Sequence, residues 1–412
     1  MIKIIFVFIC SSVFLMSFTP VINSQPEKIL SINEIIRISI DNNQTIRSSR
    51  LNIEKENSIK LRSFNIPDPE VFIEYEGVKG SLSNSESRKI GIAQEIEFPL
   101  NYFLRSDVQS SQIKAAQEEL NNSINNIKAE IKSSYSRLLL LIGLLRNSEE
   151  NFKIYEEFSF IAEKKYEAGS TSNLEVLGSK VNMIKFENQI KNLESEIKTV
   201  QSEIRYLMNA DYCILPEGEL SYKEINLNKT DMMISAVNNN PELKILKYRK
   251  EKSSDKISLS KSELYPDISL KYFRQKTGND NNQWGMEIGL GIPLWFWSDA
   301  TGKIKESNYE FKIASAEELN LKRSLENDFS RTFEEYENSL RQLKFFKEHA
   351  VKETDEILRQ SKKSYDEGEI GYVEYLNALN LVYETKTQYL NSIYNYNQSI
   401  INMEKLTAGE LK

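Results

Sequence analysis

The apolar residues of this chain follow two seams of regular helical spacing. The segment 101–168 contains hardly a helix breaker, and its apolar positions recur every three or four residues. The return segment 173–208 repeats that spacing, so the pair predicts a coiled helical hairpin, 101–208, rather than a globular core. The seam residues are Ile124, Ile127, Ile131, Tyr135, Leu138, Ile142 and Leu145 in the first segment, and Phe186, Ile190, Leu193, Ile197, Val200, Ile204 and Leu207 in the second.

Two other segments alternate apolar with polar residues, which predicts strands. Residues 69–98 contain two such runs around a loop rich in Gly, Ser and Asn, and residues 266–294 contain two more. The last run alternates large apolar residues with Glu287 and three glycines, so one face suits lipid and the other suits water or close backbone approach. A helix is expected before each hairpin, from Ser31 to Phe64 and from Thr230 to Leu264.

The chain is a tandem duplication. A first repeat, 25–210, and a second repeat, 229–412, are separated by a linker at 211–228, and the second coiled hairpin covers 299–408. Three pairs of matching segments support the duplication: Tyr166-Glu-Ala-Gly169 with Tyr365-Asp-Glu-Gly368, Asn42-Asn43 with Asn239-Asn240, and Phe98-Pro99-Leu100 with Ile292-Pro293-Leu294.

The lengths of the two long helices imply an elongated molecule. The segments 101–168 and 299–367 would each be about 100 Å long at a rise of roughly 1.5 Å per residue. Both strand hairpins should therefore lie at one end, and both turns, at Gly169 and Gly368, at the other. A unit of this kind has no obvious way to bury its apolar faces alone. The sequence thus points to an assembly rather than to a catalytic pocket.

The first 24 residues have the pattern of a secretory signal peptide. Lys3 is followed by an apolar run from Ile4 to Met16, which is too short to span a bilayer, and a small residue, Ser24, precedes the expected cut. The mature chain is therefore expected to be exported.

Composition narrows the class of function. The chain has 53 Lys and Arg against 60 Asp and Glu, a net charge of −7, which argues against nucleic acid as a partner. A single histidine and two cysteines, one of them within the signal peptide, supply no transition-metal cluster. No nucleophile–base pairing or phosphate loop is recognisable. The sequence therefore predicts no enzyme, no cofactor and no bound metal.

Four strands cannot close a membrane sheet by themselves, because the smallest transmembrane barrels need about eight strands. An open sheet with this alternation would expose aggregating edges. Closure is therefore expected from several chains.

At these residues the chain resembles the outer-membrane efflux channels of the TolC family, including those of metal and drug resistance pumps. The resemblance covers essentially the whole mature chain. It rests on the duplication, on the Tyr-x-x-Gly break with an acidic residue six positions after each glycine, and on the strand exit Gly-Leu-Gly-Ile-Pro-Leu-Trp-Phe-Trp that ends at Trp297. It implies a mainly α chain with a small β part. Three chains would form an α-barrel tunnel through the periplasm and a transmembrane β-barrel in the outer membrane.

The resemblance also implies a polar lock at the periplasmic end. Tyr365 matches the tyrosine three positions before the second glycine, and Glu175 and Glu374 match the acidic residues six after each glycine. Where the best-known members have an arginine and a second acidic residue, this chain has Ile370 and Asn377. The familiar lock is therefore incomplete, and how the channel closes stays open. Alternatively, both glutamates are solvated first-turn residues favoured by the helix dipole.

The remaining assignments concern docking and the membrane boundary. The helix turns at Gly169 and Gly368 are expected to meet the adaptor. The aromatic run beside Pro293 fits either an interfacial belt or an ordinary buried cluster. Proline suits a switch from strand to helix because it lacks the N–H that a regular ladder would use. The four junction prolines are Pro67, Pro99, Pro266 and Pro293.

The function that follows is a passive exit duct of a tripartite efflux or type I secretion system, for small molecules or metal ions. Its partners would be two further copies of the chain, a periplasmic adaptor, an inner-membrane pump and outer-membrane lipid. The alternative is an exported coiled-coil structural or adhesion protein. The sequence names neither the pump nor the cargo, whether metal, drug or protein.

Overall fold

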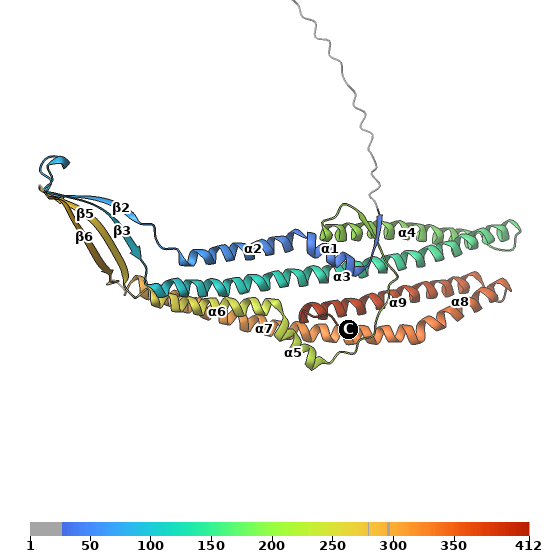
Figure 1. The fold of residues 1–412 in the computed structure, drawn as a ribbon. Helices are drawn as coiled ribbons and strands as arrows, with labels where there is room; N and C mark the ends of the chain where they lie inside the picture. The colour runs from blue at the N-terminus through green and yellow to red at the C-terminus, as the bar shows by residue number, and fades with distance from the viewer. Residues whose placement is uncertain (1–26, 279, 295–296, 412) are drawn as a thin grey trace, which may run out of the picture.

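The computed structural model describes residues 27–278, 280–294 and 297–411; the proposed signal peptide lies outside them. The chain is elongated, with the strands at one end and the two helix turns at the other (Figure 1). Most of its length is occupied by helices that run side by side. The mainly α fold, and the separation of strands from turns that the sequence predicts, are thus confirmed.

In the described part of the first half there are four α-helices, α1 (Ile32–Asn42), α2 (Gln44–Leu61), α3 (Pro99–Glu167) and α4 (Asn173–Met208), and two short 3-10 helices, η1 (Arg62–Phe64) and η2 (Leu82–Asn84). The prediction of one helix from Ser31 to Phe64 is wrong, because Asn43 separates α1 from α2. Asn43 has extended backbone, and its Oδ1 accepts hydrogen bonds from the N–H groups of Thr45 and Ile46. Asparagine is a favoured N-cap because its side chain satisfies these otherwise unpaired donors.

The second half repeats this order with α5 (Lys229–Asn239), α6 (Pro241–Ser262), α7 (Asp299–Phe345), α8 (Val351–Asp366) and α9 (Tyr372–Thr407). The prediction of one helix from Thr230 to Leu264 is likewise wrong, because Asn240 separates α5 from α6 and caps α6 as Asn43 caps α2. The predicted long helix 299–367 is interrupted by a π-helical turn, η3 (Phe346–Ala350), between α7 and α8. Its counterpart α3 runs for 69 residues as one α-helix.

The same two asparagines tie each half together. Asn43 Nδ2 donates to the carbonyl of Leu207 at 3.0 Å, and Asn240 Nδ2 donates to the carbonyl of Leu406 at 3.2 Å. In both halves the asparagine therefore joins the break between two short helices to the end of the return helix. The recurrence of Asn-Asn in the sequence reflects this double role.

The sheet is formed by β2 (Glu70–Glu76), β3 (Ser87–Ile96), β5 (Asp267–Thr277) and β6 (Asp280–Gly291), in the order β2-β3-β5-β6 and antiparallel throughout. One hairpin from each half therefore contributes two neighbouring strands. Successive residues of a strand point to opposite faces. One face is mostly apolar, and its apolar residues lie side by side in the strand register. They are Val71 and Ile73 on β2, Ile90 and Ile92 on β3, Leu270 and Tyr272 on β5, and Met286, Ile288 and Leu290 on β6.

The opposite face carries charges and a row of alternating phenylalanine and glycine. Phe72 pairs with Gly91, Gly91 with Phe273, and Phe273 with Gly285, so the row crosses all four strands. A Cβ on Gly285 would lie 2.5 Å from the ring of Phe273, and one on Gly91 would lie 2.9 Å from the ring of Phe72. The glycines thus provide the space that lets the rings lie across the neighbouring strand.

A second, small sheet was not predicted. β1 (Glu27–Leu30) pairs in parallel with β4 (Cys213–Pro216), which lies in the segment predicted as a plain linker, 211–228. Tyr135 on α3 donates to the carbonyls of Leu30 and Glu217. The linker is therefore fixed against the middle of α3.

The predicted helical seams form the interior. One buried cluster joins α3 to α4 and includes Ile131, Leu138, Val200 and Ile204. A matching cluster in the second half joins α7 to α9 through Phe329, Phe333, Tyr336, Ile393 and Tyr396. A third cluster, rich in aromatic residues, lies close to the helix turns.

Candidate functional site at the helix turns

The two helix turns have the same backbone geometry. Gly169 has φ +72° and Gly368 has φ +77°, a left-handed conformation that glycine adopts readily. In each turn the next residue's N–H bonds back to a carbonyl five residues earlier, Ser170 to Lys165 and Glu369 to Ser364, both at 2.8 Å. These bonds satisfy carbonyls that the helix end leaves open. A Cβ on either glycine would meet nothing within 4 Å, so only the backbone conformation demands glycine.

Glu175, in the first turn of α4, is held by the other hairpin. Its Oε1 accepts a hydrogen bond from the Tyr365 hydroxyl at 3.0 Å, and its other carboxylate oxygen accepts one from Thr171. Lys165 Nζ donates to the same tyrosine oxygen at 3.4 Å and lies 4.5 Å from the ring centroid. The structure thus brings together Tyr365 and Glu175, two of the residues that the family resemblance marked, from hairpins almost 200 residues apart.

Glu374 makes a different contact. Its Oε2 accepts a hydrogen bond from the backbone N–H of Gly371 at 2.7 Å, and the side chain is exposed. A glutamate at this position caps its own helix. Asn377, one turn further on, is also exposed. In the single chain Glu374 therefore caps the start of its own helix.

An aromatic cluster, which the sequence reading did not identify, joins the two hairpins behind these polar groups. Tyr365 stacks on Tyr375 with ring centroids 4.9 Å apart, and Phe158 of α3 stacks on Tyr372 of α9 at 5.0 Å. Deeper along the hairpins, Phe186 of α4 contacts Tyr383 of α9 at 4.9 Å. The signal was present in the spacing of Tyr and Phe on α3 and α9, but periodicity alone does not show which helices meet.

Ile370 packs against this cluster. It occupies the position two residues after Gly368, where the resemblance led one to look for an arginine. The side chain at this point of the turn therefore makes apolar contacts.

Burial in the aromatic cluster raises the pKa of its tyrosine hydroxyls. Burial, followed by the hydrogen bond to Glu175, raises the pKa of Tyr365 well above its usual value. Burial likewise raises the pKa of Tyr155 to about 12. Both hydroxyls stay neutral at physiological pH, so Tyr365 remains a hydrogen-bond donor toward the Glu175 carboxylate.

The four junction prolines lie where strands meet helices. Pro99 is the first residue of α3, and Pro266 directly precedes β5. Pro67 lies between the end of α2 and β2, and Pro293 follows β6 by two residues. Of the aromatic run beside Pro293, Trp295 and Phe296 lie outside the described residues.

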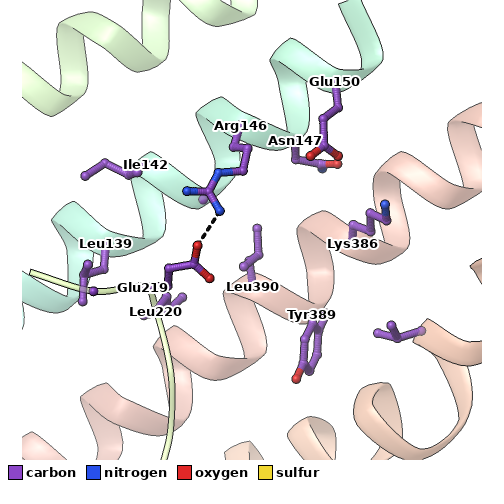
Figure 2. A pocket seen from close by; sticks show the side chains of 13 residues that line it. Leu139, Ile142, Arg146, Asn147, Glu150, Glu219, Leu220, Lys386, Tyr389 and Leu390 are labelled. Atoms are coloured by element: carbon purple, nitrogen blue, oxygen red, sulfur yellow. Dashed lines mark hydrogen bonds and ion pairs between the residues drawn. The ribbon is translucent and has the colours of Figure 1, made fainter. Parts of the chain in front are cut away.

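A cavity of about 290 Å³ lies at the middle of the chain, between the two halves. Figure 2 shows Arg146 of α3 reaching Glu219 of the linker, with Nη1 and Oε1 2.6 Å apart, while Lys386 and Tyr389 line the α9 side. Gly143 also lines it, and a Cβ there would approach Leu390 to 3.3 Å. The cavity thus marks where α3 and α9 pass close to each other under the linker.

Within the described ranges, no group of three or more His, Cys, Asp or Glu side chains could hold a metal ion. No helix in this part of the chain is long and apolar enough to cross a membrane.

Long coiled hairpins from two repeats, joined to one four-stranded sheet, define a class of elongated, mainly helical proteins, and the sequence comparison identifies the family. The model of the outer membrane efflux protein family matches residues 69–210 and 233–409. The chain belongs to this family.

Individual relatives are distant in sequence and similar in structure. The probable outer membrane lipoprotein SilC of Salmonella typhimurium is 19% identical over 411 residues, which cover 92% of this chain and 86% of that protein. A membrane protein from Pseudomonas aeruginosa has a TM-score of 0.78 at 13% identity, covering 92% of this chain and 90% of that one. The outer membrane protein VceC from Vibrio cholerae gives 0.74 at 13%, covering 92% and 97%.

Proposed function

We propose that this chain is the exit duct of a tripartite efflux system and works as a homotrimer in the outer membrane. A periplasmic adaptor and an inner-membrane pump would be its partners. The observation that carries the proposal is the position of the amphipathic sheet, at one end of helical hairpins about 100 Å long. Such a molecule can place its strands in a membrane while its helices extend away from it.

The sheet supports an assembly of several chains. Its outer strands, β2 and β6, have no partner strand on one side within the described chain, and both expose apolar side chains. An unpaired edge of this kind is prone to aggregate unless it is covered. Four strands from each of three copies, with β6 of one chain beside β2 of the next, would remove every edge.

The two faces fit the two environments of such a closed sheet. The apolar face would contact lipid. The opposite face carries ion pairs between Lys89 and Glu76 and between Lys271 and Glu287, which suit a water-filled interior. Nothing in this arrangement requires a cofactor or a reaction, so energy would come from the pump. The cargo would be small molecules or metal ions.

We further propose that the helix turns close the periplasmic end and dock the adaptor. Tyr365, Glu175 and the aromatic cluster hold the two hairpins of a chain together, so parting them would widen the mouth. Glu374 and Asn377 are exposed beside this contact and would face the mouth or the partner. Gly169 and Gly368, at the ends of the hairpins, would form the docking surface.

The alternative is an exported coiled-coil structural or adhesion protein. Such a protein would have no use for a sheet with one largely apolar face, and the apolar side chains there are exposed in the single chain, among them Val71, Ile73, Ile288 and Leu290. The sheet therefore favours the duct.

The test uses a strain that lacks the gene, complemented with the wild-type chain or with the variants Gly169→Val and Gly368→Val. The wild-type chain should restore tolerance to part of a panel of metals and drugs. It should also purify from the outer membrane as a species whose crosslinking stops at three chains. The glycine variants should keep the trimer and lose tolerance. A monomer of native helicity in detergent would refute the duct, and full tolerance with both variants would refute docking at the turns.

A further inference from the structure

Three basic side chains interrupt the apolar face of the sheet, at the end away from the helices. They are Arg88 on β3 and Arg274 and Lys276 on β5, and all three are exposed. The strand register places Arg88 directly opposite Lys276 and Arg274 opposite Ile90. Because residues two apart on a strand share a face, the three cations form one patch.

This patch places the positive charges of Arg88 and Lys276 next to each other, with no acidic side chain in the described ranges paired to either. Directly opposed like charges destabilise a strand pair. Within the described residues no ion pair involves Arg88, Arg274 or Lys276, and none of them is among the residues with further contacts. On the opposite face, by contrast, Lys89 is paired with Glu76 and Lys271 with Glu287. Unpaired cations are therefore a property of the apolar face, and an external anion would offset their repulsion.

A cavity of about 230 Å³ lies at the patch. Arg88 and Lys276 form part of its wall, together with the hydroxyl-bearing residues Ser83 and Ser85. The carboxylate of Glu86 also lines it, but Lys79 holds that group at 2.7 Å. Guanidinium, ammonium and hydroxyl donors around one hollow are the groups that bind phosphate oxygens.

The surroundings identify the phosphate carrier as a lipid. Tyr75 pairs with Arg88 in the register, and Trp284 pairs with Arg274. Trp284 is 70% exposed and lies next to Tyr272, with ring centroids 6.3 Å apart. Aromatic side chains that border an apolar band are typical of the boundary between membrane and water. The patch thus lies where head groups begin.

We propose that Arg88, Arg274 and Lys276 bind the phosphate groups of a phosphate-bearing lipid at the outer surface of the membrane. This inference rests on the proposed function, because only a membrane-embedded sheet puts its apolar face against lipid and its loops outside. A lipid bound here would cover the like-charged pair and fix the duct in its leaflet.

The test compares two double variants of the full-length protein in detergent. Arg88→Gln with Lys276→Gln removes two cations from the patch. Lys89→Gln with Lys271→Gln removes two cations from the opposite face of the same strands and serves as the matched control. The probes are lipid A with both phosphates, dephosphorylated lipid A and inorganic phosphate. Binding is measured as the shift in the unfolding temperature of the protein during titration with each probe.

The wild type and the control should bind the phosphorylated lipid at least tenfold more tightly than the dephosphorylated one. The patch variant should lose about tenfold in affinity for the phosphorylated lipid, as expected for losing charge-assisted contacts. Equal affinity of the patch variant and the wild type would overturn the site. An equal response to inorganic phosphate would overturn the lipid as its ligand. Neither result would contradict the proposed duct function. That function would be refuted separately, if the protein were absent from the outer membrane.

Discussion

The two ends of this molecule keep its internal duplication to different degrees. At the strand end both hairpins place a phenylalanine on the first strand and a glycine opposite it on the second, Phe72 with Gly91 and Phe273 with Gly285. At the turn end the backbones still match, but the side chains do not. Tyr365 is 8% exposed within the aromatic cluster, whereas its counterpart Tyr166 is 48% exposed.

The difference follows from what each end contacts. In a closed sheet every hairpin has a similar hairpin on each side, so both copies meet the same packing requirement. At the turns one hairpin packs against the other within the chain, so the two copies take complementary roles. Glu175 of the first copy accepts a hydrogen bond from the hydroxyl of Tyr365 of the second copy, whereas Glu374 caps its own helix. The two copies therefore differ at the turns, where their contact is asymmetric, and stay alike in the sheet, where β3 of one copy pairs with β5 of the other.

The largest effect is expected at the buried tyrosine. Tyr365→Ala should lower the free energy of opening of the helix turns by about 3 kcal/mol, because it removes a packed aromatic ring. Hydrogen exchange of amides in α8 and the start of α9 would report this. Tyr166→Ala is the matched control and should change exchange little. Equal effects of the two variants would mean that the halves are equivalent at this end.

The next effect tests the strand end. Gly91→Ala should destabilise the sheet by about 2 kcal/mol through overpacking, because its Cβ would lie 2.4 Å from the backbone oxygen of Tyr272. Gly285→Ala should cost less, since the obstacle is the far end of the Phe273 ring, which can rotate away. The temperature at which the assembled protein dissociates in detergent measures both. A larger loss of stability for Gly285→Ala than for Gly91→Ala would show that the Phe273 ring cannot rotate away.

The features that local sequence can specify follow the same division. The turns, the strand hairpins and the seams could be predicted because each depends on local spacing or on residues such as Gly and Pro that restrict the backbone. The pairing of β1 with β4 joins four-residue segments that carry no pattern of their own. The π-helical turn η3 interrupts the long helix at a segment that contains no glycine or proline, so the sequence contains no sign of it. Tyr365 was marked by resemblance, but its burial depends on α3 and α9 meeting across the two halves.

A smaller effect concerns pH. The pKa of Tyr365 is raised in the folded chain, so the neutral tyrosine stabilises the fold at pH values below the unfolded value of about 10. This contribution is lost as the pH rises toward the folded value, because a phenolate beside Glu175 would repel it. The protection of the amides at the turns, taken relative to the intrinsic exchange rate at each pH, should therefore fall above about pH 10. Tyr365→Phe should remove this component, and an unchanged profile would assign the transition to other tyrosines of the cluster.

The smallest effect separates the two glutamates. If three chains bring acidic side chains to a narrow mouth, they favour cations there. Glu175 accepts hydrogen bonds from Tyr365 and Thr171, whereas Glu374 is exposed and, among the described residues, is bonded only to the backbone N–H of Gly371, the N-cap of α9. Glu374→Gln should thus reduce cation preference and divalent block in planar bilayers more than Glu175→Gln does. Glutamine can still cap the helix, so stability should hardly change. Glu175→Gln should instead show itself at the turns, as faster hydrogen exchange with little change in selectivity. Identical conductance for both variants and the wild type would leave Glu374 with the capping role alone and would place the selectivity of the duct elsewhere.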